Sequence, residues 1–84
     1  MVELFRRFKP MSCAKAERAL RNLGFEEKNK SGSSHRQFKK IVDGHMRKVT
    51  LDCHKGEVSA KNAKSMISQA GVSPKEFYRA AGLA

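Results

Sequence analysis

Apolar residues recur at helical spacing near the start of the chain. They are Cys13, Ala16, Leu20 and Leu23. Because residues three and four apart share one face of a helix, these side chains form a single apolar stripe. Ser12 stands before the stripe as an N-cap, and Gly24 follows it as a stop signal. The pattern predicts a helix over residues 13–23.

A period of two, which is typical of strands, replaces the helical spacing in the middle of the chain. Residues 25–30 are mostly polar and predict a half-exposed edge strand, and the Ser/Gly stretch 31–34 predicts a turn. Side chains alternate over residues 35–42, and the Asp-Gly pair at 43–44 is a two-residue hairpin signal. Since alternation resumes over 48–53, the three segments predict an antiparallel meander.

The alternation assigns the side chains of the meander to two faces. In the second strand, one face carries Arg36, Phe38, Lys40 and Val42, and the other carries His35, Gln37, Lys39 and Ile41. In the third strand, Val49, Leu51 and Cys53 share a face, and Lys48, Thr50 and Asp52 share the opposite one. We expect one face of the sheet to pack on the core and the other to be polar and basic.

A second helical pattern follows a loop over residues 54–58. Ser59 is its N-cap, and Gly71 ends it. Its apolar stripe consists of Ala60, Ala63, Met66, Ile67 and Ala70. This pattern predicts a helix over residues 60–70.

The Ser-Pro-Lys-Glu run at 73–76 combines an N-cap, a proline at the first helical position and a capping box. It predicts an added C-terminal helix within residues 73–82. The order α-β-β-β-α predicts an α+β fold with a three-stranded antiparallel sheet and two helices on one face, as in double-stranded-RNA-binding domains. The whole chain, 1–84, fits one domain, and residues 1–11 are assigned as an N-terminal extension without a role.

Charge is the strongest global property of the chain. It has 18 Lys and Arg against 8 Asp and Glu, a formal net charge of +10. Such an excess is typical of proteins that bind nucleic acid, because their cations displace counterions from phosphate. An acidic protein partner, or a very soluble surface without any partner, would explain the same composition.

The cysteines, histidines and apolar runs indicate which compartment, membrane association and cofactors to expect. Cys13 and Cys53 are isolated, and no secretory signal precedes them, so we expect two reduced thiols in a cytoplasmic protein. No apolar run approaches membrane-spanning length, which predicts no membrane association. Since His35, His45 and His54 lack metal-ligand spacing, we expect no metal and no other cofactor.

A histidine on a basic surface is the chemistry that this sequence offers. RNA carries its own nucleophile, the 2′-hydroxyl, so a protein must only move protons and stabilise the charged phosphate. An imidazole can do the first, and lysine or arginine the second. His35 is the best-placed candidate because it opens a strand directly after the Gly/Ser turn. The competing interpretation is an ordinary exposed strand histidine, and the second proton-transfer group stays open between His54, Lys30, Lys55 and water.

We expect RNA contacts around His35 and at the end of the third strand. The predicted RNA-binding residues are Lys28, Lys30, Gly32, Ser33, Ser34, Arg36, Lys39, Lys48, His54 and Lys55. Their cations would hold phosphates, and the turn residues would offer backbone N–H groups and hydroxyls.

Short motifs along the chain resemble those of the HicA toxin family. They are Leu23-Gly24-Phe25, Ser31-Gly32-Ser33-Ser34-His35, Phe38, Asp43-Gly44, Val49-Thr50-Leu51, His54-Lys55-Gly56-Glu57-Val58, Gln69-Ala70-Gly71-Val72 and Ser73-Pro74-Lys75-Glu76-Phe77. The similarity covers residues 12–80, and the order and spacing of the motifs make it specific.

The resemblance implies a toxin of a toxin–antitoxin pair with the double-stranded-RNA-binding-like fold. Its implied activity is ribosome-independent cleavage of mRNA without a metal, and the catalytic histidine of the family maps onto His35. The implied partner is a HicB-type antitoxin that covers His35 and the basic face around it. By this resemblance we expect a monomer alone and a hetero-oligomer with the antitoxin.

The chain departs from the HicA motif at one position, and its residues also allow an alternative function. The commoner form of the family motif is Gly-Ser-His, whereas here Ser34 intervenes, and a slip of one residue exchanges the two faces of a strand. The alternative function is a non-catalytic RNA-binding module of the double-stranded-RNA-binding type. Lys61 and Lys64 are present in the last main helix, but the tight basic cluster expected of such a binder is not.

Overall fold

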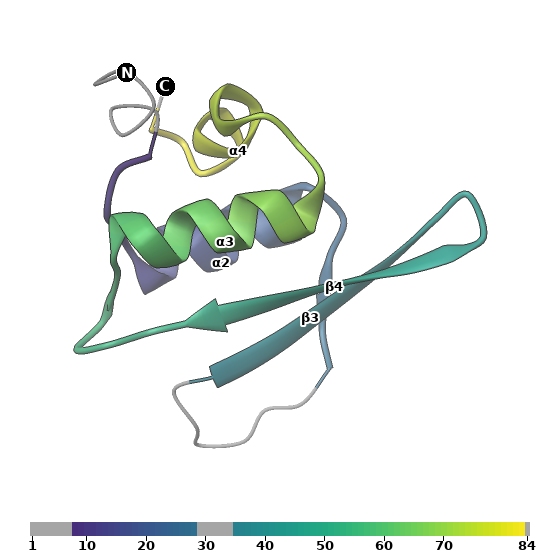
Figure 1. The fold of residues 1–84 in the computed structure, drawn as a ribbon, viewed down its shortest axis with the longest axis horizontal. Coiled ribbons are helices and arrows are strands. Elements are labelled where there is room, and N and C mark those ends of the chain that lie inside the picture. Colours follow the sequence, from purple (N-terminus) through teal and green to yellow (C-terminus); the bar gives the residue numbers. More distant parts are fainter. Residues whose placement is uncertain (1–7, 29–34, 84) are drawn as a thin grey trace.

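Two helices lie over one side of a twisted antiparallel hairpin, and a short third helix lies beyond them (Figure 1). The structure is a computed structural model that describes residues 8–28 and 35–83. Its elements are β1 (Met11–Ser12), α2 (Cys13–Asn22), β2 (Glu26–Glu27), β3 (His35–Val42), β4 (His45–Asp52), β5 (Glu57–Val58), α3 (Ala60–Ala70) and α4 (Pro74–Ala80). The predicted α+β class is confirmed within these residues, with a three-stranded antiparallel sheet in the order β2-β3-β4.

The β3–β4 hairpin turns at the predicted Asp-Gly pair. The φ angles of Asp43 and Gly44 are 51° and 79°, in the left-handed region that a tight two-residue hairpin turn requires. The strands pair without a break from Val42 opposite His45 to His35 opposite Asp52. The hairpin prediction is confirmed, and β4 begins before the predicted residue 48 because pairing starts directly at the turn.

The core lies between the sheet and the helices. Phe38 of β3 and Val49 and Leu51 of β4 are fully buried on the helix-facing side of the sheet. The helices contribute Ala16, Ala19, Leu20, Ala63, Met66, Ile67, Ala70 and Phe77. Because side chains alternate along a strand, the residues between these core positions point away from the helices. The opposite side, here called the open face, consists of His35, Gln37, Lys39 and Ile41 of β3 with Met46, Lys48, Thr50 and Asp52 of β4.

A second, two-stranded sheet was not predicted. Residues 54–58 were expected to form a loop, but β5 pairs antiparallel with β1, with Met11 opposite Val58. The two residues between His54 and Glu57 form a tight turn with φ angles of 53° and 78°. The β1 and β5 strands are only two residues long, too short to show a period of two in the sequence. Met11 and Val58 are both buried, so this small sheet closes one end of the core.

The helices begin where their cap residues predict. The hydroxyls of Ser12, Ser59 and Ser73 accept hydrogen bonds from backbone N–H groups three residues later, at 3.1–3.2 Å. Gly71 ends α3 in a left-handed conformation with φ of 76°. The first helix ends at Asn22, one residue before the predicted end. Within the described residues, no helix is long and apolar enough to cross a membrane.

The structure corrects the prediction for the cysteines. Cys13, the first residue of α2, and Cys53, which follows β4, form a disulfide with Cα atoms 5.9 Å apart. The expectation of two reduced thiols is therefore wrong for this structure. The pairing spans 40 residues, so it depends on the tertiary fold rather than on any local spacing.

Candidate active site

His35 lies on the open face of the sheet, at the end far from the hairpin turn. It opens β3 opposite Asp52, and its side chain is 59% exposed. Phe38, three residues later in β3, points to the other side and is fully buried, so the helices do not cover the imidazole. Ser34, the extra residue of the family motif, lies outside the described residues, but the register of β3 places His35 on the polar side.

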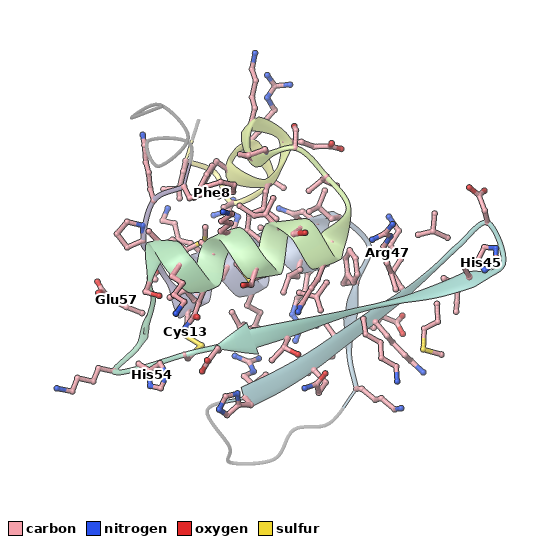
Figure 2. The ribbon with its side chains drawn as sticks, in the orientation of Figure 1. Phe8, Cys13, His45, Arg47, His54 and Glu57 are labelled. Atoms are coloured by element: carbon pink, nitrogen blue, oxygen red, sulfur yellow. A yellow bond between two sulfur atoms is a disulfide. The ribbon has the colours of Figure 1, made fainter. Side chains whose placement is uncertain are left out.

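Asp52 brings two histidines together at this end of the sheet. Its Oδ1 atom lies 3.2 Å from Nε2 of His54 and 3.7 Å from Nδ1 of His35. His54 follows β4 beside the disulfide, as Figure 2 shows, and its ring is 69% exposed. One carboxylate oxygen therefore faces two solvent-accessible imidazoles, one from β3 and one from the turn after β4.

The Asp52 carboxylate is held more firmly than the two rings. Its side chain is 24% exposed, and its Oδ1 is buried without an aligned hydrogen bond from any described residue. Its Oδ2 accepts a hydrogen bond of 3.4 Å from the side-chain amide of Asn62 on α3. A buried carboxylate oxygen that lacks a donor is costly, so an N–H group that aligns with Oδ1 would stabilise it.

Three lysines surround a shallow hollow farther along the open face. Lys39 and Lys48 lie opposite each other in the register, and Lys28 follows β2 beside them. With Gln37 and Phe38 they line a hollow of about 220 Å³. Within the described residues, neither Lys39 nor Lys48 has a hydrogen-bonded or ion-paired protein partner, so their charges are available to an anion.

On the helix-facing side of the sheet, Arg36 is bound by carboxylates of the protein itself. Arg36 donates two hydrogen bonds of 2.7 Å to the Glu27 carboxylate and one of 2.9 Å to Glu17. The Glu27 side chain is only 3% exposed. The Glu27 carboxylate, followed by Glu17, raises the pKa of Arg36 above its ordinary value, against the opposing effect of burial. The hydrogen bond from Arg21, more than that from Arg36, lowers the pKa of Glu17.

Two other cations of this side bind carbonyl groups at helix ends. Lys40 Nζ donates a 2.6 Å hydrogen bond to the carbonyl of Leu23, just after α2. Arg47 donates one of 3.0 Å to the carbonyl of Gln69 near the end of α3, where Figure 2 places it. Positive charge at a helix C-terminus is favourable because the last carbonyls carry partial negative charge. These cations therefore stabilise the fold.

The predicted RNA-binding residues that the structure describes fall into three groups. Lys28, Lys39 and Lys48 lie around the hollow, and His54 and Lys55 lie beyond β4 near Asp52. Arg36 is held by two carboxylates on the opposite side, so an RNA contact from it stays a prediction that must compete with those ion pairs. Lys30, Gly32, Ser33 and Ser34, which are also predicted to contact RNA, lie outside the described residues.

Sequence reasoning did not single out Asp52 or Asn62. A signal for Asp52 was present, because equal steps outward from the two-residue turn at 43–44 bring His35 opposite Asp52. No comparable signal existed for Asn62, since its approach depends on how α3 packs against β4. The described residues contain no group of three His, Cys, Asp or Glu side chains arranged to hold a metal ion.

A comparison with models of known protein families identifies one family that matches this chain. The family model described as HicA toxin of bacterial toxin-antitoxin matches residues 13–72. The match covers more than half of the chain and includes His35, Asp52 and His54. No curated protein matches the chain. The resemblance seen in the sequence is thus confirmed, and the chain belongs to the HicA toxin family of bacterial toxin–antitoxin systems.

Proposed function

We propose that this chain is an endoribonuclease toxin that cleaves mRNA without a metal and uses His35 as an acid/base catalyst. The HicA family is generally a family of mRNA interferases, which supports the reaction class. The single observation that carries the proposal is the position of His35. Its ring is exposed on the open face and lies 3.7 Å from Asp52, where an RNA backbone can reach it.

The reaction needs few protein groups because RNA supplies its own nucleophile. A base takes the proton of a 2′-hydroxyl, the oxygen attacks the adjacent phosphorus, and the 5′-oxygen leaves. Properly placed proton transfer contributes roughly 10²- to 10⁴-fold to such a rate. A carboxylate beside the imidazole orients the ring and stabilises its protonated form.

The lysines of the open face would hold the substrate. Lys28, Lys39 and Lys48 lie along the same side of the sheet as His35, so a strand bound across them would run toward the histidine. Contacts of this kind bind phosphate without reading bases. The net charge of +10 adds a long-range attraction for RNA.

A protein partner belongs to the same proposal. The toxin–antitoxin family implies an antitoxin. We infer a HicB-type antitoxin that covers His35 and the lysines of the open face, and thereby excludes RNA. Co-expression with the neighbouring antitoxin gene should restore the growth of a host that the toxin alone arrests.

The test is cleavage of an unstructured RNA in the presence of a metal chelator. We expect the wild-type protein to leave a 2′,3′-cyclic phosphate or a 3′-phosphate, and His35→Ala to lose roughly 10²-fold or more of the rate. His45→Ala is the matched control, because His45 is exposed at the hairpin tip, at the opposite end of β4 from Asp52 and far from His54 (Figure 2).

Equal rates for His35→Ala and the wild type would show that the site assignment is wrong. A wild-type protein that binds RNA but never cuts it would instead support a non-catalytic RNA-binding module.

A further inference from the structure

We propose that His54 is the second proton-transfer group of this site, and that Asp52 is the positioning residue between the two imidazoles. The inference rests on the proposed ribonuclease activity and adds to it the group that protonates the leaving oxygen. In this assignment His35 takes the proton of the 2′-hydroxyl, and His54 gives a proton to the 5′-oxygen.

The geometry of one carboxylate oxygen supports a paired site. Oδ1 of Asp52 lies within 4 Å of a ring nitrogen of both His35 and His54, although the two rings come from β3 and from the turn after β4. Both rings are more than half exposed, so one phosphodiester can approach both. A lone surface histidine would need no such shared, half-buried carboxylate.

The charge balance suits an acid–base pair. A single carboxylate can offset the charge of one imidazolium. Efficient acid–base catalysis needs one neutral ring and one protonated ring. His54 is the ring closer to Oδ1, at 3.2 Å against 3.7 Å, and we assign it as the acid.

Each step then balances. The 2′-oxygen loses its proton to His35 and forms a bond to phosphorus. The bond from phosphorus to the 5′-oxygen breaks, and that oxygen takes the proton of His54. The products are a 2′,3′-cyclic phosphate and a 5′-hydroxyl end, and water later exchanges the proton between the rings.

The surrounding elements fix His54 in place. Its backbone N–H donates to the carbonyl of Glu57 at 2.9 Å, and its carbonyl accepts from the Glu57 N–H at 3.0 Å. Cys53, the residue before it, is bonded to Cys13 at the start of α2. A residue anchored on both sides can hold its ring in one position, as a catalytic group requires.

Among the described residues, few other charged groups lie near His54. Asp52 faces it from β4 and His35 from β3, while Lys55 and Glu57 belong to its own turn. On α3, Asn62 holds the other oxygen of Asp52, and Lys61 precedes Asn62 in sequence. Only Asp52 forms an ion pair with the His54 ring among the described residues.

The deciding experiment compares two RNA substrates of the same sequence. One is natural RNA, and the other has sulfur in place of the bridging 5′-oxygen at the position that the wild type cuts. A thiolate leaves without protonation, so its departure needs no general acid. We expect His54→Ala to cut natural RNA about 10²-fold more slowly than wild type and to cut the sulfur substrate at nearly the wild-type rate. His35→Ala should be slow on both.

The pH profile gives a second, independent readout. A base and an acid that act together give a rate that falls at both low and high pH, so the wild type should show this bell-shaped profile on natural RNA. His54→Ala should lose the decline at high pH and keep the one at low pH. Asp52→Asn should slow both substrates, because Asp52 acts through both rings. His45→Ala should match the wild type throughout, and a thermal melt checks that each variant folds.

The outcomes separate this inference from the proposed function. If His35→Ala is inactive but His54→Ala is unimpaired, or equally slow on both substrates, His54 is not the acid and only this inference is overturned. Wild-type activity in Asp52→Asn would overturn the positioning role of Asp52. If the wild type cuts neither RNA, the proposed function fails and this inference fails with it.

Discussion

At the scale of single residues, strand alternation divides the cations of the hairpin into two sets. Arg36, Lys40 and Arg47 point toward the helices and bind carboxylates or carbonyls of the protein itself. Lys39 and Lys48 point the other way and line a hollow. The net charge alone therefore overstates the charge available for RNA, because part of it stabilises the fold.

Arg36→Ala should destabilise the protein more than any change on the open face. The substitution leaves Glu27, only 3% exposed, without the guanidinium that donates to both of its carboxylate oxygens. It also removes the contact of the guanidinium with the Phe38 ring, 5.6 Å from its centroid. Removing the closest partner of a buried charge costs up to about 3 kcal/mol of unfolding free energy, measurable by urea denaturation, and the longer 3.4 Å contact from Arg21 to Glu27 reduces this cost.

Lys39→Ala is the control for that measurement, since it removes one cation from the open face of the same strand, three residues after Arg36. Its expected change in unfolding free energy is below about 0.5 kcal/mol. Similar losses for both variants would contradict the structural role assigned to Arg36.

At the scale of elements, the sequence predicted those structural features that depend on residues close together in the chain. The three capped helices, the tight Asp-Gly turn and the two faces of the hairpin all follow from short-range signals. The β1–β5 pairing, the disulfide and the Asn62 contact join residues far apart in sequence, and no periodicity encodes them. Asp52 lies between these cases, because its partner follows from the turn but its role depends on His54.

The disulfide is the element-scale feature with the clearest consequence. It joins the start of α2 to the residue after β4 and closes a long loop, which restricts the unfolded chain. Replacing both Cys13 and Cys53 with serine should lower the unfolding free energy by about 2–4 kcal/mol. A thermal melt with and without a reducing agent measures this effect.

In that melt, a reductant should lower the stability of the wild type toward that of the double serine variant and leave the variant unchanged. A wild-type melting temperature that does not respond to complete reduction would contradict a stabilising role for the bond.

At the scale of the whole molecule, the helices and the open face of the sheet have different roles. The helices cover one side of the sheet (Figure 1) and build the core. The other side carries His35 and Asp52 at one end and Lys39 and Lys48 toward the middle. Farther out, Ile41 and Met46 are exposed near the hairpin tip, at 62% and 50%. A long substrate can thus lie along a side that no described helix obstructs.

Lys39→Ala combined with Lys48→Ala should weaken RNA binding in a salt-dependent way. Each phosphate contact to a single strand contributes about 0.7 to the slope of log affinity against log salt, so losing two contacts should reduce the slope by about 1.4. The cleavage rate at saturating RNA should change little, because neither lysine lies next to His35 in the register. Binding titrations at several salt concentrations measure the slope.

Lys75→Ala combined with Arg79→Ala is the matched control, since both residues are exposed on α4. Either pair lowers the net charge by two, from +10 to +8. Long-range attraction depends on total charge and would fall equally for both pairs, whereas contact with phosphate depends on position. Equal slopes for the two double variants would mean that RNA is held by general electrostatic attraction and does not lie on the open face. A smaller slope only in the Lys39 and Lys48 variant would indicate that RNA lies along the open face toward His35.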